Sequence, residues 1–441
     1  MNFTKYLGKW LRSLFPAAKP ERGSFCIQPF RHIYLLPNGH IKPCCVFDGA
    51  IRDYEGPMSI ERVSAADIWD SAHMRRVRSK MVNNLPVEEC RYCYQQEAMG
   101  AVSPGENVTG AWVAGWVNTD ALTPTDFRKS AAESGLRAVP ETMDIVLGST
   151  CNLKCRHCFS DSSSAIAGDA VHSAWAPLSS SPFVPTEGKV VPWPKRKASL
   201  MTSLLRDPEQ FKSIALGGGE TLIMKEAQDL MQHLIDTGAA ERIALSIYTN
   251  ATVISDAWFE LAAGFKTLGI SVSIDGIGTT YDYIRYPATW QMVSAGFQRL
   301  QSLTNATLCI TMVVQAYNML NVVEVSRFCE AVGVPLFPYA LQEPSHLSSF
   351  IMPASIRREA ARRLRAYAES SEISWHQQLL DLADAWETAP EREPALLHRF
   401  MVFSNDLDAS RGQDFGSIFP ELLSMLNAAG IEWTTEQRFA G

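Results

Sequence analysis

The sequence predicts an α/β fold, because short β-branched runs alternate with amphipathic helical stretches from about Met143 onward. This alternation is typical of parallel strands joined by helices. The candidate strands are residues 143–148, 211–217, 242–249, 268–275, 307–315 and 334–341. Since a closed barrel of such units needs about eight of them, six units predict an open, partial TIM-like (β/α)6 barrel.

Helical periodicity fills the segments between the strands. Ala227, Leu230, Met231 and Leu234 recur at intervals of three and four residues, which places them on one helical face. The C-terminal region, residues 346–441, contains the stretches IRREAARRLRAYAES and WHQQLLDLADAWE, which are typical of helices. We expect these helices to cover the open side of the barrel.

Length and composition place the chain among ordinary globular proteins. Its 441 residues, with 46% hydrophobic and 20% charged side chains, allow two or three domains. The net charge of −7 gives no overall attraction for nucleic acid, so no nucleic-acid partner is expected. No apolar run reaches the roughly 18 residues of a membrane span, and no secretory signal is present. We therefore expect a cytoplasmic protein without a transmembrane segment.

The first 22 residues have the pattern of an amphipathic segment. Phe3, Leu7, Trp10 and Leu11 fall near one helical face, and Pro16 would end the helix. Such a helix can dock on a membrane surface or a partner, or it can fold onto the protein's own body. We favour the protein's own body, since one short helix binds membranes only marginally.

Three cysteines follow the first predicted strand with a C-x3-C-x2-C spacing. Cys151, Cys155 and Cys158 lie at the carboxyl end of that strand, where barrel active sites assemble. Three thiolates can bind three irons of a [4Fe–4S] cluster and leave the fourth iron open to a substrate or cofactor. A structural zinc site needs a fourth ligand, and His157 is the one candidate within the loop. We favour the iron–sulfur cluster.

Further motifs follow in order along the later strands, and with the cysteines they carry a resemblance to a known family. They are the segments Leu216–Glu220, Thr249–Asn250 and Ser271–Gly276, and Gln315. Over residues 141–345 the chain resembles the radical S-adenosylmethionine (radical SAM) superfamily. The resemblance implies reductive cleavage of S-adenosylmethionine at the [4Fe–4S] cluster to a 5′-deoxyadenosyl radical, which takes hydrogen from a substrate. It also implies a flavodoxin- or ferredoxin-type electron donor.

The same resemblance assigns cofactor contacts to the later motifs. Gly218 and Gly219 let the backbone approach the methionyl end of the cofactor, although a tight turn would also need glycine. Glu220 supplies an acceptor for the cofactor ammonium group. Asn250 and Gln315 belong to the same set of contacts.

Three further side chains complete the expected cofactor site. Ser273 and Asp275 are two residues apart and therefore share one face, near the ribose or the carboxylate. Arg285 is a candidate partner for the cofactor carboxylate, with a structural salt bridge as the alternative. His157 stands where the family usually has an apolar aromatic residue, and its imidazole can still stack on adenine.

A second group of cysteines lies near the N-terminus. Cys26, Gly39 and Cys44, followed later by Cys90 and Cys93, resemble the first part of the SPASM and twitch modules, which bind auxiliary iron–sulfur clusters. The resemblance implies one auxiliary cluster, expected to be [4Fe–4S], with the four cysteines as its ligands. Cys45 is an alternate ligand or a bystander. Four thiolates would also suit structural zinc, and this module precedes the barrel, whereas in most relatives it follows.

These features predict five parts of the chain. They are the amphipathic segment 1–22, the auxiliary cluster module 23–97, a connector 98–140, the radical SAM core 141–345 and the helical region 346–441. Residues 160–200 are rich in Ser and Pro and predict a long loop, either a substrate lid or an insertion.

We expect the substrate to be a peptide or protein side chain, because radical enzymes with auxiliary clusters often modify peptides. A small molecule such as a sugar, nucleoside or amino acid is the alternative. An electron-transfer protein that does not cleave S-adenosylmethionine is a third interpretation, which the intact Gly-Gly-Glu and Ser-x-Asp motifs argue against.

Overall fold

The computed structural model describes residues 25–98, 103, 105, 124–133, 140–175 and 211–439. The predicted segment 1–22, residues 176–200 of the predicted loop and most of the predicted connector 98–140 lie outside these ranges. The chain divides into two compact units. The first comprises residues 1–148, 182–217 and 229–245, and the second comprises residues 149–181, 218–228 and 246–441.

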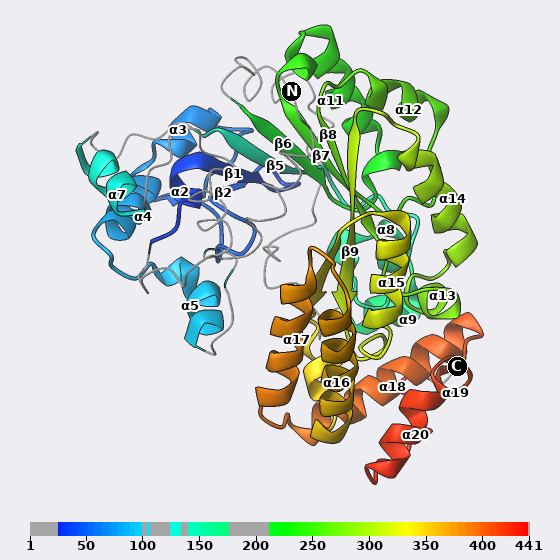
Figure 1. The fold of residues 1–441 in the computed structure, drawn as a ribbon. Coiled ribbons are helices and arrows are strands. Elements are labelled where there is room, and N and C mark those ends of the chain that lie inside the picture. The colour runs from blue at the N-terminus through cyan, green and yellow to red at the C-terminus, as the bar shows by residue number, and fades with distance from the viewer. Residues whose placement is uncertain are drawn as a thin grey trace. The chain divides into compact units, whose positions relative to one another are not determined.

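In the first unit, two N-terminal strands, β1 and β2, lie in the same sheet as the first strands of the predicted radical SAM core, β5 and β6 (Figure 1). A hairpin of β1 (His32–Leu35) and β2 (Ile41–Lys42) is antiparallel, with Leu35 opposite Ile41. On its other side β1 pairs in parallel with β5 (Thr142–Val146), which in turn pairs in parallel with β6 (Ser213–Gly217). The hairpin therefore extends the sheet of the core at its first strand.

Helices and a small core complete the first unit. The elements are α2 (Gln28–Arg31), β3 (Arg52–Asp53), β4 (Gly56–Pro57), α3 (Ala65–Trp69), α4 (Ala72–Val82), the 3-10 helix η1 (Glu88–Cys90), α5 (Arg91–Ala98) and α7 (Pro124–Glu133). Ser64 and Ser71 cap α3 and α4 by accepting a hydrogen bond from the amide three residues later. Apolar side chains from α2 and α4, including Phe30, Val77 and Met81, form the buried cluster.

The second unit contains the later strands and the helices that alternate with them. The strands are β7 (Ala244–Thr249), whose first two residues belong to the first unit, β8 (Leu268–Ser273), β9 (Ala306–Val314) and β10 (Leu336–Ala340). The helices are α11 (Lys225–Asp236, shared between the units), α12 (Asp256–Ala263), α13 (Thr279–Ile284), α14 (Trp290–Gln301) and α15 (Val322–Val332). β8 pairs in parallel with β9, and β9 with β10.

Alternation along these strands separates a buried face from an open one. On β9, Ile310, Met312 and Val314 are fully buried, whereas Thr311 and Val313 between them are half-buried. The face of Thr311 is therefore the one that the hydrophobic core leaves accessible.

The C-terminal region is helical, as predicted. It consists of α16 (Ala354–Ser370), α17 (His376–Thr388), α18 (Pro394–Arg411), α19 (Phe415–Ile418) and α20 (Pro420–Ala428). α16 and α17 pack side by side, gold and orange in Figure 1. Arg365 of α16 joins them by an ion pair with Glu387 of α17 at 2.8 Å.

The six predicted strands are confirmed. They occupy residues 142–146, 213–217, 244–249, 268–273, 306–314 and 336–340. The predicted loop after residue 160 instead begins with the short helices η2 (Ser160–Ser162), α8 (Ser164–Ala167) and α9 (Ala170–Trp175). Ser163 makes α8 possible, because its hydroxyl accepts a hydrogen bond from the Ile166 amide. Across the described parts of the chain, no helix has the length and apolarity needed to cross a membrane.

Candidate active site

The loop that follows β5 carries the three cysteines of the C-x3-C-x2-C motif. Its own hydrogen bonds shape it: the Ser164 hydroxyl accepts from the Cys151 amide at 3.2 Å, and the Ser163 hydroxyl donates to the Leu153 carbonyl at 2.7 Å. The Cys158 amide donates to the carbonyl of Cys155 at 3.0 Å. These three hydrogen bonds therefore help to define the course of the loop.

The three thiols differ in their surroundings. Cys155 is buried, whereas Cys151 and Cys158 are half-buried. A hydrogen bond from Cys158, with the nearby Arg285, lowers the pKa of the Cys155 thiol, and the same bond raises the pKa of Cys158. Burial raises the pKa of Cys151 to about 11. Of the three, Cys155 is therefore the thiol that ionises most easily, and the thiolate is the form that binds metal.

Arg285 connects Cys155 to the end of β8. Its Nη1 lies 3.9 Å from Cys155 Sγ, and its Nε donates to Asp275 Oδ2 at 2.8 Å. Asp275 is fully buried, and its other oxygen accepts from the Val313 amide at 2.7 Å. Of the two roles expected for Arg285, the structure shows the salt bridge. A contact with the cofactor carboxylate stays a prediction.

His157 points toward the ends of the strands. Its Nδ1 lies 3.2 Å from Gln315 Nε2, and its Nε2 lies 3.7 Å from Asp275 Oδ2. Burial lowers the pKa of His157 to about 4, so the ring is neutral near pH 7. Gln315 is fully buried, and its side-chain oxygen has no hydrogen-bond partner among the described residues. That oxygen is an acceptor suited to a donor on a bound cofactor.

The Gly-Gly-Glu motif packs against the start of the cysteine loop. A side chain at Gly219 would collide with the carbonyl group of Thr150, and the Glu220 amide donates to that carbonyl at 2.8 Å. Gly218 has a φ of +135°, which favours glycine. Of the two reasons considered for these glycines, the structure shows the tight turn. Their approach to a cofactor stays a prediction.

Glu220 is buried and already makes three hydrogen bonds. Its Oε1 accepts from the Thr249 hydroxyl at 2.5 Å and from the Leu222 amide at 3.1 Å, and its Oε2 accepts from the Asn250 amide at 2.6 Å. A carboxylate offers about four acceptor positions. Glu220 therefore holds the turn to the end of β7 and keeps one position for the predicted ammonium contact.

A ring of amide and hydroxyl groups ties the same strand end to the cysteine loop. Asn250 Nδ2 donates to Asn152 Oδ1 at 3.1 Å, and Asn152 Nδ2 donates to Thr252 Oγ1 at 2.9 Å. The Thr252 amide closes the ring by donating to Asn250 Oδ1 at 3.0 Å. Asn250 was a predicted site residue, whereas Asn152 was not, although its position between two cysteines was a usable signal.

Ser273 ends β8 on the accessible face. It is half-buried and lies opposite Thr311 of β9 in the strand register. The neighbouring Ser271 pairs its hydroxyl with that of Thr311 at 3.2 Å. Asp275 follows two residues after Ser273, outside the strand. The expected contact of Ser273 with the cofactor stays a prediction.

The N-terminal cysteines gather within the first unit. Burial raises the pKa of Cys44 well above its usual range, and the neighbouring sulfurs of Cys45, Cys26, Cys90 and Cys93 raise it further. Cys45 is exposed, unlike the other four. The Cys44 sulfur therefore lies in the neighbourhood of the other three cysteines predicted as auxiliary ligands, and Cys45 is the exposed member of the group.

Gly105, which belongs to the predicted connector, lies beside two of these sulfurs. A Cβ on Gly105 would be 3.5 Å from Cys26 Sγ and 3.7 Å from Cys93 Sγ. No sequence pattern links a connector glycine to distant cysteines, so this contact was not predicted.

Both groups of cysteines offer the donors that iron–sulfur clusters use, since thiolates are the usual cluster ligands. Among the residues that the structure describes, no three or more His, Cys, Asp or Glu side chains are arranged to hold a metal ion. The ligand assignments therefore stay predictions, which rest on thiol chemistry and on the position of each group in the fold.

Two family profiles match the chain over the segments just described. Residues 145–329 match the radical SAM superfamily. Residues 26–94 match SPASM, an iron–sulfur cluster-binding domain. The chain belongs to the radical SAM superfamily. The predicted family is thereby confirmed, as are the partial barrel and a SPASM domain that precedes it. S-adenosylmethionine, the radical SAM cluster and a SPASM auxiliary cluster follow as its cofactors.

Solved structures of two other proteins are similar at low identity. SuiB of Streptococcus suis bound to S-adenosylmethionine is 13% identical, with a TM-score of 0.39, over 65% of this chain and 59% of SuiB. Native anSMEcpe with bound AdoMet is 18% identical, with a TM-score of 0.38, over 53% of this chain and 63% of that protein. The chain thus spans about three fifths of these proteins. No curated protein sequence matches it.

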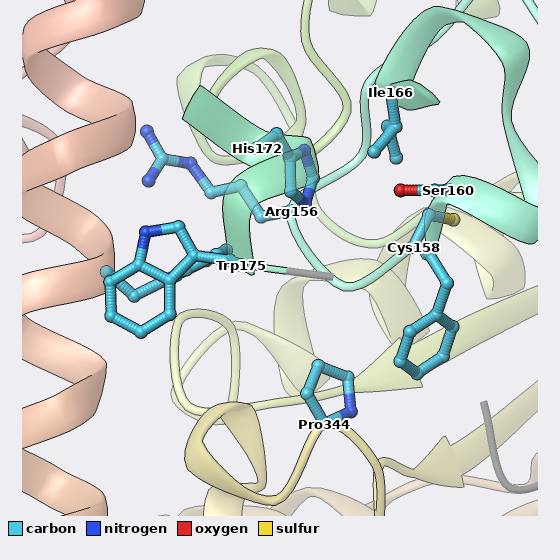
Figure 2. A pocket seen from close by; sticks show the side chains of 9 residues that line it. Arg156, Cys158, Ser160, Ile166, His172, Trp175 and Pro344 are labelled. Carbon is cyan, nitrogen blue, oxygen red and sulfur yellow. The ribbon is translucent and has the colours of Figure 1, made fainter. Parts of the chain in front are cut away.

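A small pocket of this radical SAM protein lies beside the third cysteine of the motif (Figure 2). Its lining residues are Arg156, Cys158, Phe159, Ser160, Ile166, His172, Trp175, Pro344 and Phe403. Most of this lining is apolar, and burial lowers the pKa of His172 to about 3. The start of the predicted loop 160–200, through α9, and the C-terminal helix α18 therefore meet at the cysteine loop.

Proposed function

We propose that Cys151, Cys155 and Cys158 hold the radical SAM [4Fe–4S] cluster and that the enzyme modifies a peptide or protein side chain. The observation that carries the cluster site is the convergence of three motifs on the cysteine loop. Glu220 binds Asn250, which is hydrogen-bonded to Asn152 of the loop. Arg285, held by Asp275, contacts Cys155 of the same loop. When bound, the cluster and S-adenosylmethionine supply the radical that takes hydrogen from the substrate.

The residues of the chain orient the cofactor and exclude water. Arg285 places a positive charge against Cys155 and is itself held by Asp275. Gln315 offers a buried oxygen to a donor on the cofactor, such as an amino group. Glu220 and Asn250 fix the turn at the end of β7, so that the cofactor meets a preformed surface.

The SPASM domain and the accessible strand face support a peptide substrate. Radical SAM enzymes with auxiliary clusters often act on peptides, and Cys26, Cys44, Cys90 and Cys93 are the proposed auxiliary ligands. On the strand face, Ser273 and Thr311 present hydroxyl groups, and Tyr339 is 56% exposed. Hydroxyl groups beside an exposed aromatic ring suit a polypeptide, which offers amides and apolar side chains together.

Cofactor cleavage tests the enzymatic part of this proposal. The anaerobically reconstituted protein is mixed with dithionite and S-adenosylmethionine, and 5′-deoxyadenosine is measured. We expect cleavage in the unaltered protein and none in Cys155→Ala. Absence of 5′-deoxyadenosine from the unaltered protein would leave an electron-transfer protein as the better interpretation. A flavodoxin- or ferredoxin-type protein should replace dithionite as the electron donor.

Substrate class needs a separate measurement. Candidate peptides encoded beside the gene are incubated with the reconstituted enzyme, and their masses are followed. A mass change that requires S-adenosylmethionine supports the peptide assignment. Unchanged peptides, together with faster 5′-deoxyadenosine formation on adding a sugar, nucleoside or amino acid, would replace it with a small-molecule substrate.

A further inference from the structure

Arg156 stands between Cys155 and His157, yet its side chain leaves the cofactor site. The residue is fully buried, and its amide donates to the Ile284 carbonyl at 2.9 Å. In Figure 2 the side chain extends toward the salmon-coloured C-terminal helix. His157 meanwhile contacts Gln315. Successive residues of the loop are thus anchored in different parts of the second unit.

The guanidinium of Arg156 is fixed by groups from two regions. Its Nη2 lies 2.5 Å from Asp408 Oδ1 of α18 and 2.8 Å from Gln413 Oε1, which follows α18. Its Nε donates to the Tyr283 carbonyl at 3.0 Å, and its central carbon lies 3.5 Å from the centre of the Tyr283 ring. These contacts use the planar, forked shape of arginine, which lysine does not have.

Asp408 links this contact to the next helix. Its second oxygen accepts from the Phe415 amide at 2.7 Å, at the start of α19. One carboxylate therefore joins the end of α18, the start of α19 and the cysteine loop. A buried charge needs its partner, because an unpaired one loses its hydration without compensation. The position of Arg156 consequently depends on these C-terminal helices.

We infer that Arg156 is a positioning residue through which α18 and α19 hold the cluster-binding loop, so that the C-terminal region stabilises the cluster itself. The inference rests on the proposed function, in which Cys151, Cys155 and Cys158 bind that cluster. Asp408 contacts none of these cysteines in the described structure and lies 252 residues from Arg156 in sequence. A change at Asp408 should nevertheless loosen the cluster.

Release of iron tests this inference on the holoenzyme. Reconstituted protein is treated with EDTA, and the reduced-cluster EPR signal that responds to S-adenosylmethionine is followed over time. We expect this signal to decay about tenfold faster in Arg156→Gln and in Asp408→Asn than in the unaltered protein. Arg156→Lys, which keeps the charge but loses the fork, should decay at an intermediate rate.

Arg357→Gln is the matched control. Arg357 is equally buried and donates to the carbonyls of Met352, Trp386 and Ala389, so its loss should lower stability without reaching the cysteine loop. Decay in Asp408→Asn and Arg156→Lys no faster than in Arg357→Gln would overturn the inference, even if Arg156→Gln fails to fold. An unaltered protein that binds no cluster would overturn the proposed function, and the inference with it.

Discussion

Gly219 lies directly against the carbonyl group of Thr150, so the Gly-Gly-Glu turn and the cysteine loop touch through their backbones. A side chain at residue 219 has no room unless one of the two segments moves. The Glu220 amide, which donates to the same carbonyl at 2.8 Å, holds them at this distance. The glycine is therefore needed for contact between two protein segments, whether or not it also approaches a cofactor.

Gly219→Ala should destabilise the protein by about 1–3 kcal/mol, the usual cost of overpacking. Gly217→Ala is the control, because a Cβ there meets nothing within 4 Å. Urea unfolding of the two variants measures the difference. Equal unfolding midpoints would show that the Thr150 contact does not require glycine.

Glu220→Gln should destabilise the protein by about 2 kcal/mol or more, because hydrogen bonds to a buried charged group are stronger than neutral ones. Glutamine keeps one acceptor oxygen, whereas three donors face Glu220. Thr249→Val, which removes one of those donors, should destabilise the protein less than Glu220→Gln. In the double variant the two effects should not add, because both changes act on the hydrogen bond between Thr249 and residue 220. If the losses of unfolding free energy in the two single variants add up to the loss in the double variant, the two side chains are not directly hydrogen-bonded.

The strands could be predicted because each has a local signal. On β9 the fully buried Ile310, Met312 and Val314 alternate with residues of the accessible face, and period two along a strand encodes that difference. The pairing of β1 with β5 had no such signal. His32 and Thr142 are hydrogen-bonded at 2.8 Å but lie 110 residues apart in sequence, and a local pattern does not specify which distant strand is the neighbour.

The site residues also divide into those with a local sequence signal and those without one. The cysteine spacing identified Cys151, Cys155 and Cys158, because cluster chemistry constrains the ligands directly. The partner of Arg285 stayed open, since either Asp275 or a cofactor carboxylate satisfies a guanidinium. Arg156 was not predicted at all. Its partner Asp408 lies on the same helix as Arg411, but Asp408 pairs with Arg156, and Arg411 donates to His172 at 3.1 Å.

Cys44→Ser should lower bound iron from about eight to about four per chain, whereas Cys45→Ser should leave it unchanged, if each cluster holds four irons. The two cysteines are adjacent, but the sulfurs of Cys26, Cys90 and Cys93 all raise the pKa of Cys44, whereas Cys45, whose pKa is raised by the sulfur of Cys93, is exposed. Iron and sulfide analysis of the reconstituted proteins makes the comparison. The reverse result would assign the auxiliary ligand to Cys45, and no loss in either variant would remove this segment from the cluster site.

His346 should make the protein less stable in acid. Burial, with Arg399 nearby, lowers its pKa from the ordinary 6.5 to about 3. Between these values the unfolded chain binds a proton that the folded chain does not, so stability falls as the pH drops below about 6.5, by up to about 1.4 kcal/mol per pH unit. His346→Phe keeps an aromatic ring beside Phe403, whose ring centre lies 5.0 Å away, and cannot be protonated. The thermal unfolding midpoints of the unaltered protein and the variant should therefore agree best above pH 7. Between pH 7 and pH 5.5 the midpoint of the variant should fall less. Parallel curves over that range would mean that His346 accepts a proton in the folded protein.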